Sequence, residues 1–263
     1  MRNVQWVVQS NLNQQDVLRI ENACRENNVM FTPIYVIPFS TELPDFDKSI
    51  PAIYYGSTTM GHLVRGEKGF FMNDNFTVKV LSENYGDLLL NYAGHVYVIE
   101  YLMQLMSLWE PDYHFIRPID DSKSFAGQLI HTYEIQDWFA KLQQSDSTEL
   151  TMSSEVLVAR PRKIETEWRL WIVLGKVIAA SQYRRNDILI KKEGCPTGVK
   201  DFAELVCRLW TPHDVFCMDV CVLPEVDEPR IVECGCFNSC GFYAADVNEI
   251  VKQVTNYYES MAV

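Results

Sequence analysis

Residues 215–235 read VFCMDVCVLPEVDEPRIVECG, two apolar runs on either side of a short acidic loop bounded by prolines. Apolar runs that flank such a loop predict an antiparallel hairpin, with strands at 215–223 and 230–234. Each strand carries one carboxylate, Asp219 in the first and Glu233 in the second. With the loop centred on Val226, these two carboxylates are expected to lie opposite each other across the ladder.

Two facing carboxylates repel each other, and burial adds a desolvation cost. A cation between them removes the repulsion, and hard oxygen ligands of this kind suit Mg²⁺. Asn238 follows the second strand and offers a further, neutral oxygen. The hairpin therefore predicts a magnesium site, with the alternative that one of the two carboxylates points to solvent.

The rest of the chain divides by pattern into a first part where strands and helices alternate and a later antiparallel part. Strand-like runs at 4–8, 30–37 and 52–55, separated by helical patterns, predict a small and mostly parallel α/β unit over about the first 75 residues. Runs at 167–174 and 176–183 around Gly175 predict a second hairpin. Helices are expected at 17–28, 83–93, 96–109, 128–143, 202–210 and 247–261.

Two groups of cationic residues stand near predicted strand ends. Arg117 ends a strand at 113–116, and Lys123 follows in a polar loop. This pair suits a polyphosphate, because Arg binds phosphate bidentately and Lys adds a point charge. The alternative for this pair is a solvated surface position. In the hairpin, alternation places Arg169 on the same face as Glu167, so its anionic partner is either Glu167 or a nucleotide phosphate.

Composition narrows the classes of partner. The chain has 263 residues, a formal net charge of −12 and a sequence pI near 4.9, which disfavours general attraction to nucleic acids or anionic membranes. The sequence shows neither a signal-peptide h-region nor a spanning apolar stretch, so a cytoplasmic protein with reduced cysteines is expected.

Five of the eight cysteines fall at 217, 221, 234, 236 and 240. Their spacing contains no C-x₂-C knuckle, which favours small buried residues over the alternative of a zinc-stabilised module.

Six short motifs occur in an order that resembles the ATP-grasp superfamily, and within it a clade, frequent in phage and bacterial genomes, that is marked by an Arg–Lys pair. The motifs are FIRP at 115–118, KSFAG at 123–127, EWR at 167–169, SQYR at 181–184, VE at 232–233 and FNSCGFY at 237–243. The resemblance covers residues 110–245 well. Residues 1–80 resemble the family only as a generic preceding α/β domain.

The resemblance implies an α/β chain, α+β in its C-terminal part, with an ATP-grasp fold. It implies a Rossmann-like pre-ATP-grasp domain at 1–80 and an ATP-grasp domain at 81–263 whose two α+β subdomains clamp ATP. For the nucleotide, the resemblance implies phosphate contacts from Arg117 and Lys123, adenine recognition by Val158, Ala159 and Arg160, a ribose contact from Glu165 and a further cofactor contact from Ser181. It implies that Asp219, Glu233 and Asn238 are the Mg²⁺ ligands. The catalytic residues it implies are Arg169 and Arg184.

Such proteins transfer the γ-phosphate of ATP to a carboxylate and then join the acyl phosphate to an amine. The resemblance thus implies a Mg²⁺-dependent carboxylate–amine ligase, acting on a small-molecule or peptide carboxylate in a bacterial or infected-cell cytoplasm. One departure stands out, because the family commonly has Asn two residues after the metal-binding Glu and this chain has Gly235. The alternative function is therefore a nucleotide-binding regulatory protein without ligase turnover.

Overall fold

The computed structural model describes residues 2–121, 124–144, 150–224 and 226–261. The chain forms two compact units, a large unit of Met1–Asp74 with Ile164–Val263 and a small unit of Asn75–Lys163. The predicted division at residue 80 falls near the first boundary between these units. The large unit, however, joins the N-terminal residues to the C-terminal third of the chain.

The N-terminal part of the large unit is a parallel sheet in the order β2-β1-β3. All five residues of the central strand β1 are buried, as expected of a parallel strand covered on both faces. This confirms the predicted parallel α/β pattern. The elements are β1 (Gln5–Gln9), α1 (Gln14–Glu26), β2 (Met30–Ile34), β3 (Ala52–Tyr55) and α2 (Thr58–Leu63).

The C-terminal part of the large unit is an antiparallel five-stranded sheet in the order β10-β9-β8-β11-β12, with α6 packed against β9, β11 and β12. Both predicted hairpins are present, whereas the exposed edge strand β10 was not predicted. The elements are β8 (Thr166–Val173), β9 (Lys176–Arg185), β10 (Ile188–Glu193), α6 (Thr197–Leu209), β11 (Val215–Leu223) and β12 (Val226–Gly235).

The turn between β8 and β9 consists of Leu174 and Gly175, because Val173 pairs with Lys176. Both residues have positive φ, 49° and 73°, as a two-residue type I′ turn requires. The sequence placed Leu174 at the end of the first strand of this hairpin, but its position in the turn leaves it 62% exposed.

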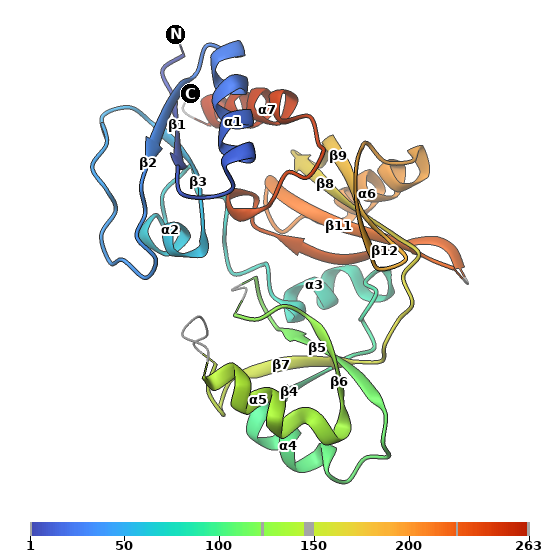
Figure 1. The fold of residues 1–263 in the computed structure, drawn as a ribbon. Helices are drawn as coiled ribbons and strands as arrows, with labels where there is room; N and C mark the ends of the chain where they lie inside the picture. The colour runs from blue at the N-terminus through green and yellow to red at the C-terminus, as the bar shows by residue number, and fades with distance from the viewer. Residues whose placement is uncertain (1, 122–123, 145–149, 225, 262–263) are drawn as a thin grey trace. The chain divides into compact units, whose positions relative to one another are not determined.

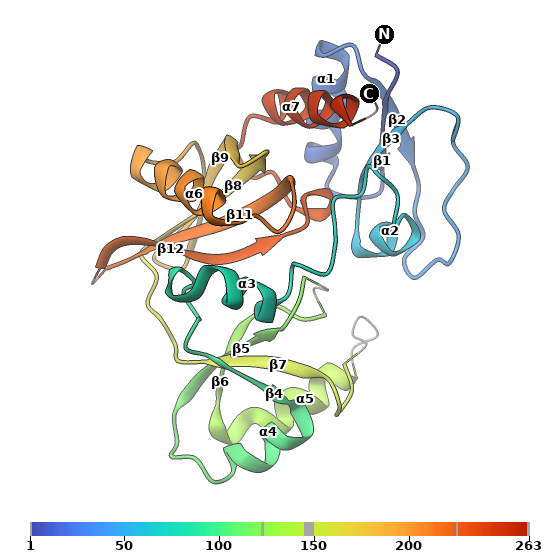
Figure 2. The same ribbon diagram turned by 180° about the vertical axis from the view of Figure 1, so that it is seen from behind.

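One hydrophobic core holds the two sheets of the large unit together. Helix α7 (Val247–Ser260) lies beside α1, as Figures 1 and 2 show from opposite sides. The Trp6 indole donates a buried hydrogen bond to Thr255 Oγ1 at 2.9 Å, and the Tyr55 hydroxyl donates to the carbonyl of Cys240 at 2.6 Å. Because this core draws on both ends of the chain, the N-terminal sheet and the C-terminal sheet form one unit.

The small unit is an antiparallel sheet in the order β4-β7-β5-β6, with α4 and α5 covering one face (Figure 1). The elements are α3 (Val78–Tyr85), β4 (His95–Val98), α4 (Ile99–Met106), β5 (Tyr113–Pro118), β6 (Gln128–His131), α5 (Ile135–Gln143) and β7 (Glu155–Ala159). Three short 3₁₀ turns, η1 (Gly86–Leu88), η2 (Thr132–Glu134) and η3 (Phe237–Ser239), complete the described elements of the chain.

Three helix predictions in the small unit were wrong at their boundaries. The helix expected at 83–93 ends at Tyr85, and the helices expected at 96–109 and 128–143 begin with strands β4 and β6. Short strands such as β4 and β6 gain their stability from pairing with β7 and β5, which local periodicity does not show.

Among the described residues, no helix combines the length and the hydropathy needed to span a membrane.

Candidate functional site

Four residues predicted from separate motifs lie in one row across the five-stranded sheet. Ser181 of β9 pairs with Arg169 of β8, Arg169 pairs with Asp219 of β11, and Asp219 pairs with Glu233 of β12. Residues directly opposite each other in a sheet share a face. The two carboxylates and the arginine therefore stand side by side, and we call these four residues the site row.

The pairing of Asp219 with Glu233 confirms the prediction, and it depends on a β-bulge. Beyond the site row, Val220 pairs with Ile231, so Val232 has no counterpart on β11. Without that extra residue the same ladder would set Asp219 opposite Val232 and turn Glu233 to the other face. The bulge thus brings the two carboxylates together.

Arg169 grips Asp219 with two parallel hydrogen bonds, from Nε to Oδ1 at 2.8 Å and from Nη2 to Oδ2 at 2.7 Å. The carboxylate is buried, with its side chain only 4% exposed. The predicted partner of Arg169 was Glu167 or a phosphate, whereas its partner in the structure is Asp219. This bidentate geometry offsets the cost of burying the Asp219 charge.

Glu167 lies two residues before Arg169 on β8, next to Tyr183 and Arg184. The Tyr183 hydroxyl donates to Glu167 Oε2 at 2.7 Å and lies 3.3 Å from Asp219 Oδ2, so it stands between the two buried carboxylates. Arg184 Nη1 lies 3.3 Å from Glu167 Oε1, yet this oxygen accepts no hydrogen bond of good geometry in the described residues. Arg184 thus acts on Glu167 mainly through its charge.

Tyr183 is also the bulged residue of β9, because Glu167 pairs with Arg184 and Trp168 with Gln182. Its ring stacks on Tyr243 at 5.0 Å between centroids, and the Arg169 guanidinium lies 5.3 Å from the Tyr243 centroid. Neither tyrosine was among the site residues that the sequence predicted. The available signal was their place in two of the motifs, SQYR and FNSCGFY.

Burial raises the pKa of Glu167, against the opposing hydrogen bond from Tyr183 and the charge of Arg184. The folded chain therefore binds this proton more tightly than the unfolded chain does. The contribution of Glu167 to stability is fully present below its unfolded pKa, about 4.3, and is lost as pH rises through the raised folded value.

We therefore expect the free energy of unfolding of the wild type to fall relative to that of Glu167→Gln as pH rises from about 4 to about 8. Urea unfolding of both proteins across this range measures the difference, in which the other titrating groups cancel. Glu204→Gln is the control, because the hydrogen bond from Lys176 lowers the pKa of Glu204. For this variant, the free energy of unfolding of the wild type should rise relative to that of the variant as pH rises. A Glu167→Gln difference that is constant or rises with pH would contradict this account.

Asn238 has a different role from the metal ligand that the sequence predicted. Its buried side-chain amide donates to the carbonyls of Tyr54 and Gly69, and its Oδ1 accepts from the backbone N–H of Phe71 at 2.7 Å. These bonds fasten the turn after β12 to the N-terminal segments of the large unit. The amide is thus engaged with backbone rather than presented to a metal.

Ser181 is likewise occupied within the protein. Its buried hydroxyl accepts from the backbone N–H of Ala244 at 3.1 Å and lies 3.0 Å and 3.2 Å from the carbonyl oxygens of Gln182 and Lys192. This is at odds with the direct cofactor contact expected from the sequence. The hydroxyl holds the segment that carries Tyr243 against β9 and β10.

The remaining predicted residues are divided between the two units. In the small unit, Arg117 lies half-buried on β5 and pairs in register with Leu157 of β7. Alternation along β7 puts the buried Ala159 on the same face as Arg117 and Val158 on the opposite face. Lys123 lies outside the described residues.

In the large unit, Glu165 is half-buried, and its backbone N–H donates to the carbonyl of Val222 at 3.0 Å. This bond secures the start of β8 against β11.

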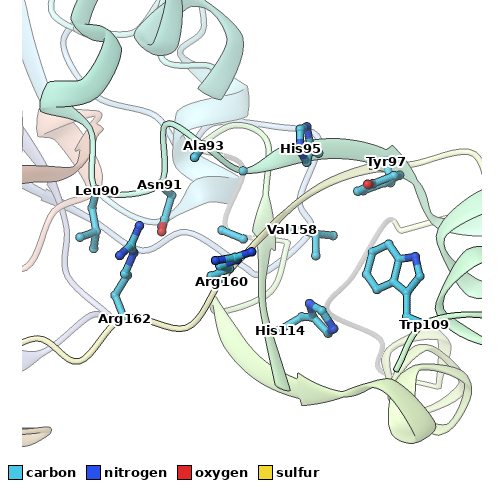
Figure 3. Close-up of a pocket in the computed structure, with 12 residues that line it drawn as sticks. Leu90, Asn91, Ala93, His95, Tyr97, Trp109, His114, Val158, Arg160 and Arg162 are labelled. Atoms are coloured by element: carbon cyan, nitrogen blue, oxygen red, sulfur yellow. The ribbon is translucent and has the colours of Figure 1, made fainter. Parts of the chain in front are cut away.

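A pocket of about 520 Å³ opens in the small unit next to the segment that was predicted to contact adenine. Figure 3 shows Val158 and Arg160 near the centre of the lining residues, with Arg162 on the side of Leu90 and Asn91. We call it the aromatic pocket. Its other lining residues are Leu90, Asn91, Ala93, Gly94, His95, Tyr97, Trp109, His114 and Ala159.

All eight cysteines are free thiols, and the five in the C-terminal third are buried. In the described part of the chain, no group of three or more His, Cys, Asp or Glu side chains is arranged to hold a metal ion. The five cysteines of the C-terminal third are therefore buried core residues. The Trp171 indole, for example, donates to Cys240 Sγ at 3.2 Å.

A family model described as "ATP-grasp domain, R2K clade family 3" matches residues 78–254. This range contains the small unit almost completely, together with the whole five-stranded sheet. No curated protein sequence matches the chain.

Solved structures of ATP-grasp ligases share the fold over nearly the whole chain. D-alanine–D-alanine ligase from Bacillus anthracis has 13% identity and a TM-score of 0.63, covering 98% of this chain and 99% of that chain. D-cycloserine synthetase DcsG has 11% identity and a TM-score of 0.60, covering 95% and 99%. The ligase PsnB, complexed with minimal precursor, Mg and ADP, has 12% identity and a TM-score of 0.56, covering 98% and 98%.

Proposed function

Because the chain belongs to the R2K clade of ATP-grasp domains, we propose that it is a ligase that joins a carboxylate to an amine with ATP and Mg²⁺. The observation that carries this proposal is the pairing of Asp219 with Glu233 beside Arg169 in one row of the sheet. Two carboxylates and a guanidinium in register suit a site that must hold both a divalent cation and anionic oxygens.

Asp219 and Glu233 would hold Mg²⁺, and the donor set fits this ion because both ligands are hard oxygens. The two bonds from Arg169 use one lone pair on each Asp219 oxygen, and a carboxylate has about four acceptor sites, so metal and guanidinium can share it. Bound Mg²⁺ neutralises phosphate charge. Asn238 is left out of this ligand set because its amide is already bonded to backbone.

The reaction proceeds in two steps. An oxygen of the carboxylate substrate attacks the γ-phosphorus of ATP, the bond to the bridging oxygen breaks, and ADP leaves. The amine then attacks the acyl carbon, phosphate leaves, and the nitrogen loses a proton to give the amide. The protein's part is positioning and charge neutralisation, which calls for no Ser or Cys nucleophile.

We assign the remaining roles from the clade motifs. Arg117 and Lys123 hold phosphates, and Arg169 with Arg184 neutralises the charge that develops during transfer. The backbone of the segment containing Val158, Ala159 and Arg160 contacts adenine, with Glu165 on the ribose. The complex of the similar ligase PsnB with minimal precursor, Mg and ADP supports ATP, Mg²⁺ and a peptide or small-molecule carboxylate as the ligand classes. A cytoplasmic location and a phage or bacterial origin stay predictions.

Nucleotide binding is tested by thermal unfolding with and without ATP and Mg²⁺. At a hundredfold excess over the dissociation constant, the ligand is expected to raise the melting temperature by about 5–10 °C. Arg117→Met should reduce this shift, whereas Lys141→Met, which removes an exposed cation on α5 of the same unit, should leave it unchanged. Ligase turnover is tested by ADP release in pooled carboxylates and amines, with mass spectrometry of the product.

A second function, a nucleotide-binding regulatory protein without turnover, is favoured by two observations. Gly235 stands where the family commonly has Asn, and Asn238 is bonded to backbone and so does not replace it. This alternative predicts the full thermal shift with no carboxylate-dependent ADP release. ADP release that requires a carboxylate would eliminate it.

A further inference from the structure

The aromatic pocket has a lining that is unusual for a chain of net charge −12, since none of its twelve lining residues is Asp or Glu. Its walls carry Tyr97, Trp109 and two histidines, and two arginines stand at its side. The Trp109 ring lies 4.9 Å from the His114 ring and 5.9 Å from the Tyr97 ring, measured between centroids. Such a lining favours a flat ring with a negative charge.

The pocket lies on the opposite face of the small sheet from Arg117. His95 of β4 and Ile116 of β5 both pair with Val158, so these three residues share one face. Arg117 pairs with Leu157, the neighbour of Val158, and therefore points to the other face. Arg117 therefore does not reach the pocket from its own face of the sheet, so a ligand in the pocket is held by the pocket's own residues rather than by Arg117.

Three polar groups of the pocket have bonding capacity to spare. His114 Nε2 is fully enclosed and has no hydrogen-bond partner in the described residues. Burial lowers the pKa of His114, so the ring is neutral near pH 7 and can donate or accept one bond. Within that same part of the chain, the exposed Arg160 and Arg162 form neither a salt bridge nor a hydrogen bond, which leaves both guanidinium groups available to an anion.

We propose that the aromatic pocket binds an aromatic anion, a planar ring system that carries a carboxylate or a phosphate. The ring packs against the wall formed by Tyr97, Trp109 and His114, and the anionic group pairs with Arg162 and Arg160. A volume of about 520 Å³ is in the range of small-molecule sites. This ligand is additional to the ATP and the acceptor of the proposed ligase.

The test is a titration of the full-length protein by ligand-observed NMR with a matched pair of probes. Indole-3-carboxylate and indole-3-carboxamide have the same ring and shape and differ in charge. The carboxylate is expected to bind about tenfold more tightly, the value of a charge-assisted hydrogen bond. Arg162→Gln should remove this difference in affinity, and Trp109→Ala should weaken the binding of both probes. Lys163→Gln is the control, because Lys163 is a neighbouring exposed cation that does not line the pocket, and its loss should leave the binding of both probes unchanged.

A third probe, 3-indoxyl phosphate, carries a phosphate in place of the carboxylate. Comparing its affinity with that of indole-3-carboxylate shows whether the pocket prefers an aromatic phosphate or an aromatic carboxylate. Either preference supports the proposal. Equal binding of the acid and the amide, no binding of any probe, or an unchanged preference in Arg162→Gln would overturn it. Displacement of the probes by saturating ATP and Mg²⁺ would also overturn it, because the pocket would then belong to the nucleotide. Arg162 is exposed, so its variant tests the pocket even if Trp109→Ala does not fold.

Discussion

Glu233→Gln is expected to lower ATP turnover by at least about a hundredfold, since a metal ligand contributes several kcal/mol to a transition state of this kind. The glutamine keeps the size of the side chain and the register with Asp219, but it removes the charge that attracts Mg²⁺. The Mg²⁺ concentration at half-maximal activity should therefore rise, and excess Mg²⁺ should restore part of the rate. That partial rescue separates a metal ligand from a merely structural residue.

Glu228→Gln is the matched control for this variant. Glu228 lies on the same strand, forms a surface ion pair with Arg230 at 3.1 Å and is 70% exposed. Its loss should leave both the rate and the Mg²⁺ dependence unchanged. Asp219→Asn should match the Glu233→Gln effect on rate and should also abolish the thermal shift with ATP and Mg²⁺. If Glu233→Gln and Glu228→Gln behave alike, the carboxylate pair does not hold the metal.

The site row shows how far sequence reasoning reaches. Apolar strands with single carboxylates, and an acidic loop of countable length, were enough to set Asp219 opposite Glu233. The bulge at Val232 was not visible, because a bulge depends on how β11 and β12 pair rather than on local composition. The prediction of facing carboxylates was right, although the simple count on which it was based does not hold along the whole ladder.

The partners of polar side chains were the least predictable feature. Arg169 was expected to bind Glu167 or a phosphate, and it binds Asp219, which lies 50 residues away in sequence. Asn238 was expected at a metal, and it bonds to backbone 167 to 184 residues away. Such partners belong to segments that are distant in sequence, so no local pattern records them. The helices expected at 96–109 and 128–143 were wrong at their first residues for a similar reason, because strands β4 and β6 are stabilised by pairing with neighbouring strands.

Arg169→Met is expected to lower the free energy of unfolding by about 3–5 kcal/mol, because it leaves the buried Asp219 carboxylate without its cation. Both bonds of this pair are short, 2.7 Å and 2.8 Å, and the Asp219 side chain is only 4% exposed. Water cannot readily replace the guanidinium there, and the nearby Tyr183 hydroxyl already donates to Glu167. Urea unfolding at pH 7 measures the loss.

Lys176→Met provides the comparison on the next strand of the same sheet. Lys176 pairs with Glu204 at 2.9 Å, a similar distance, but its side chain is 68% exposed. Its loss should therefore cost about 0–1 kcal/mol. Adding Asp219→Asn to Arg169→Met should return part of the lost stability, because the double variant removes the uncompensated charge as well. If Arg169→Met costs no more than Lys176→Met, or if the second substitution adds to the loss, the buried pair does not stabilise the site row.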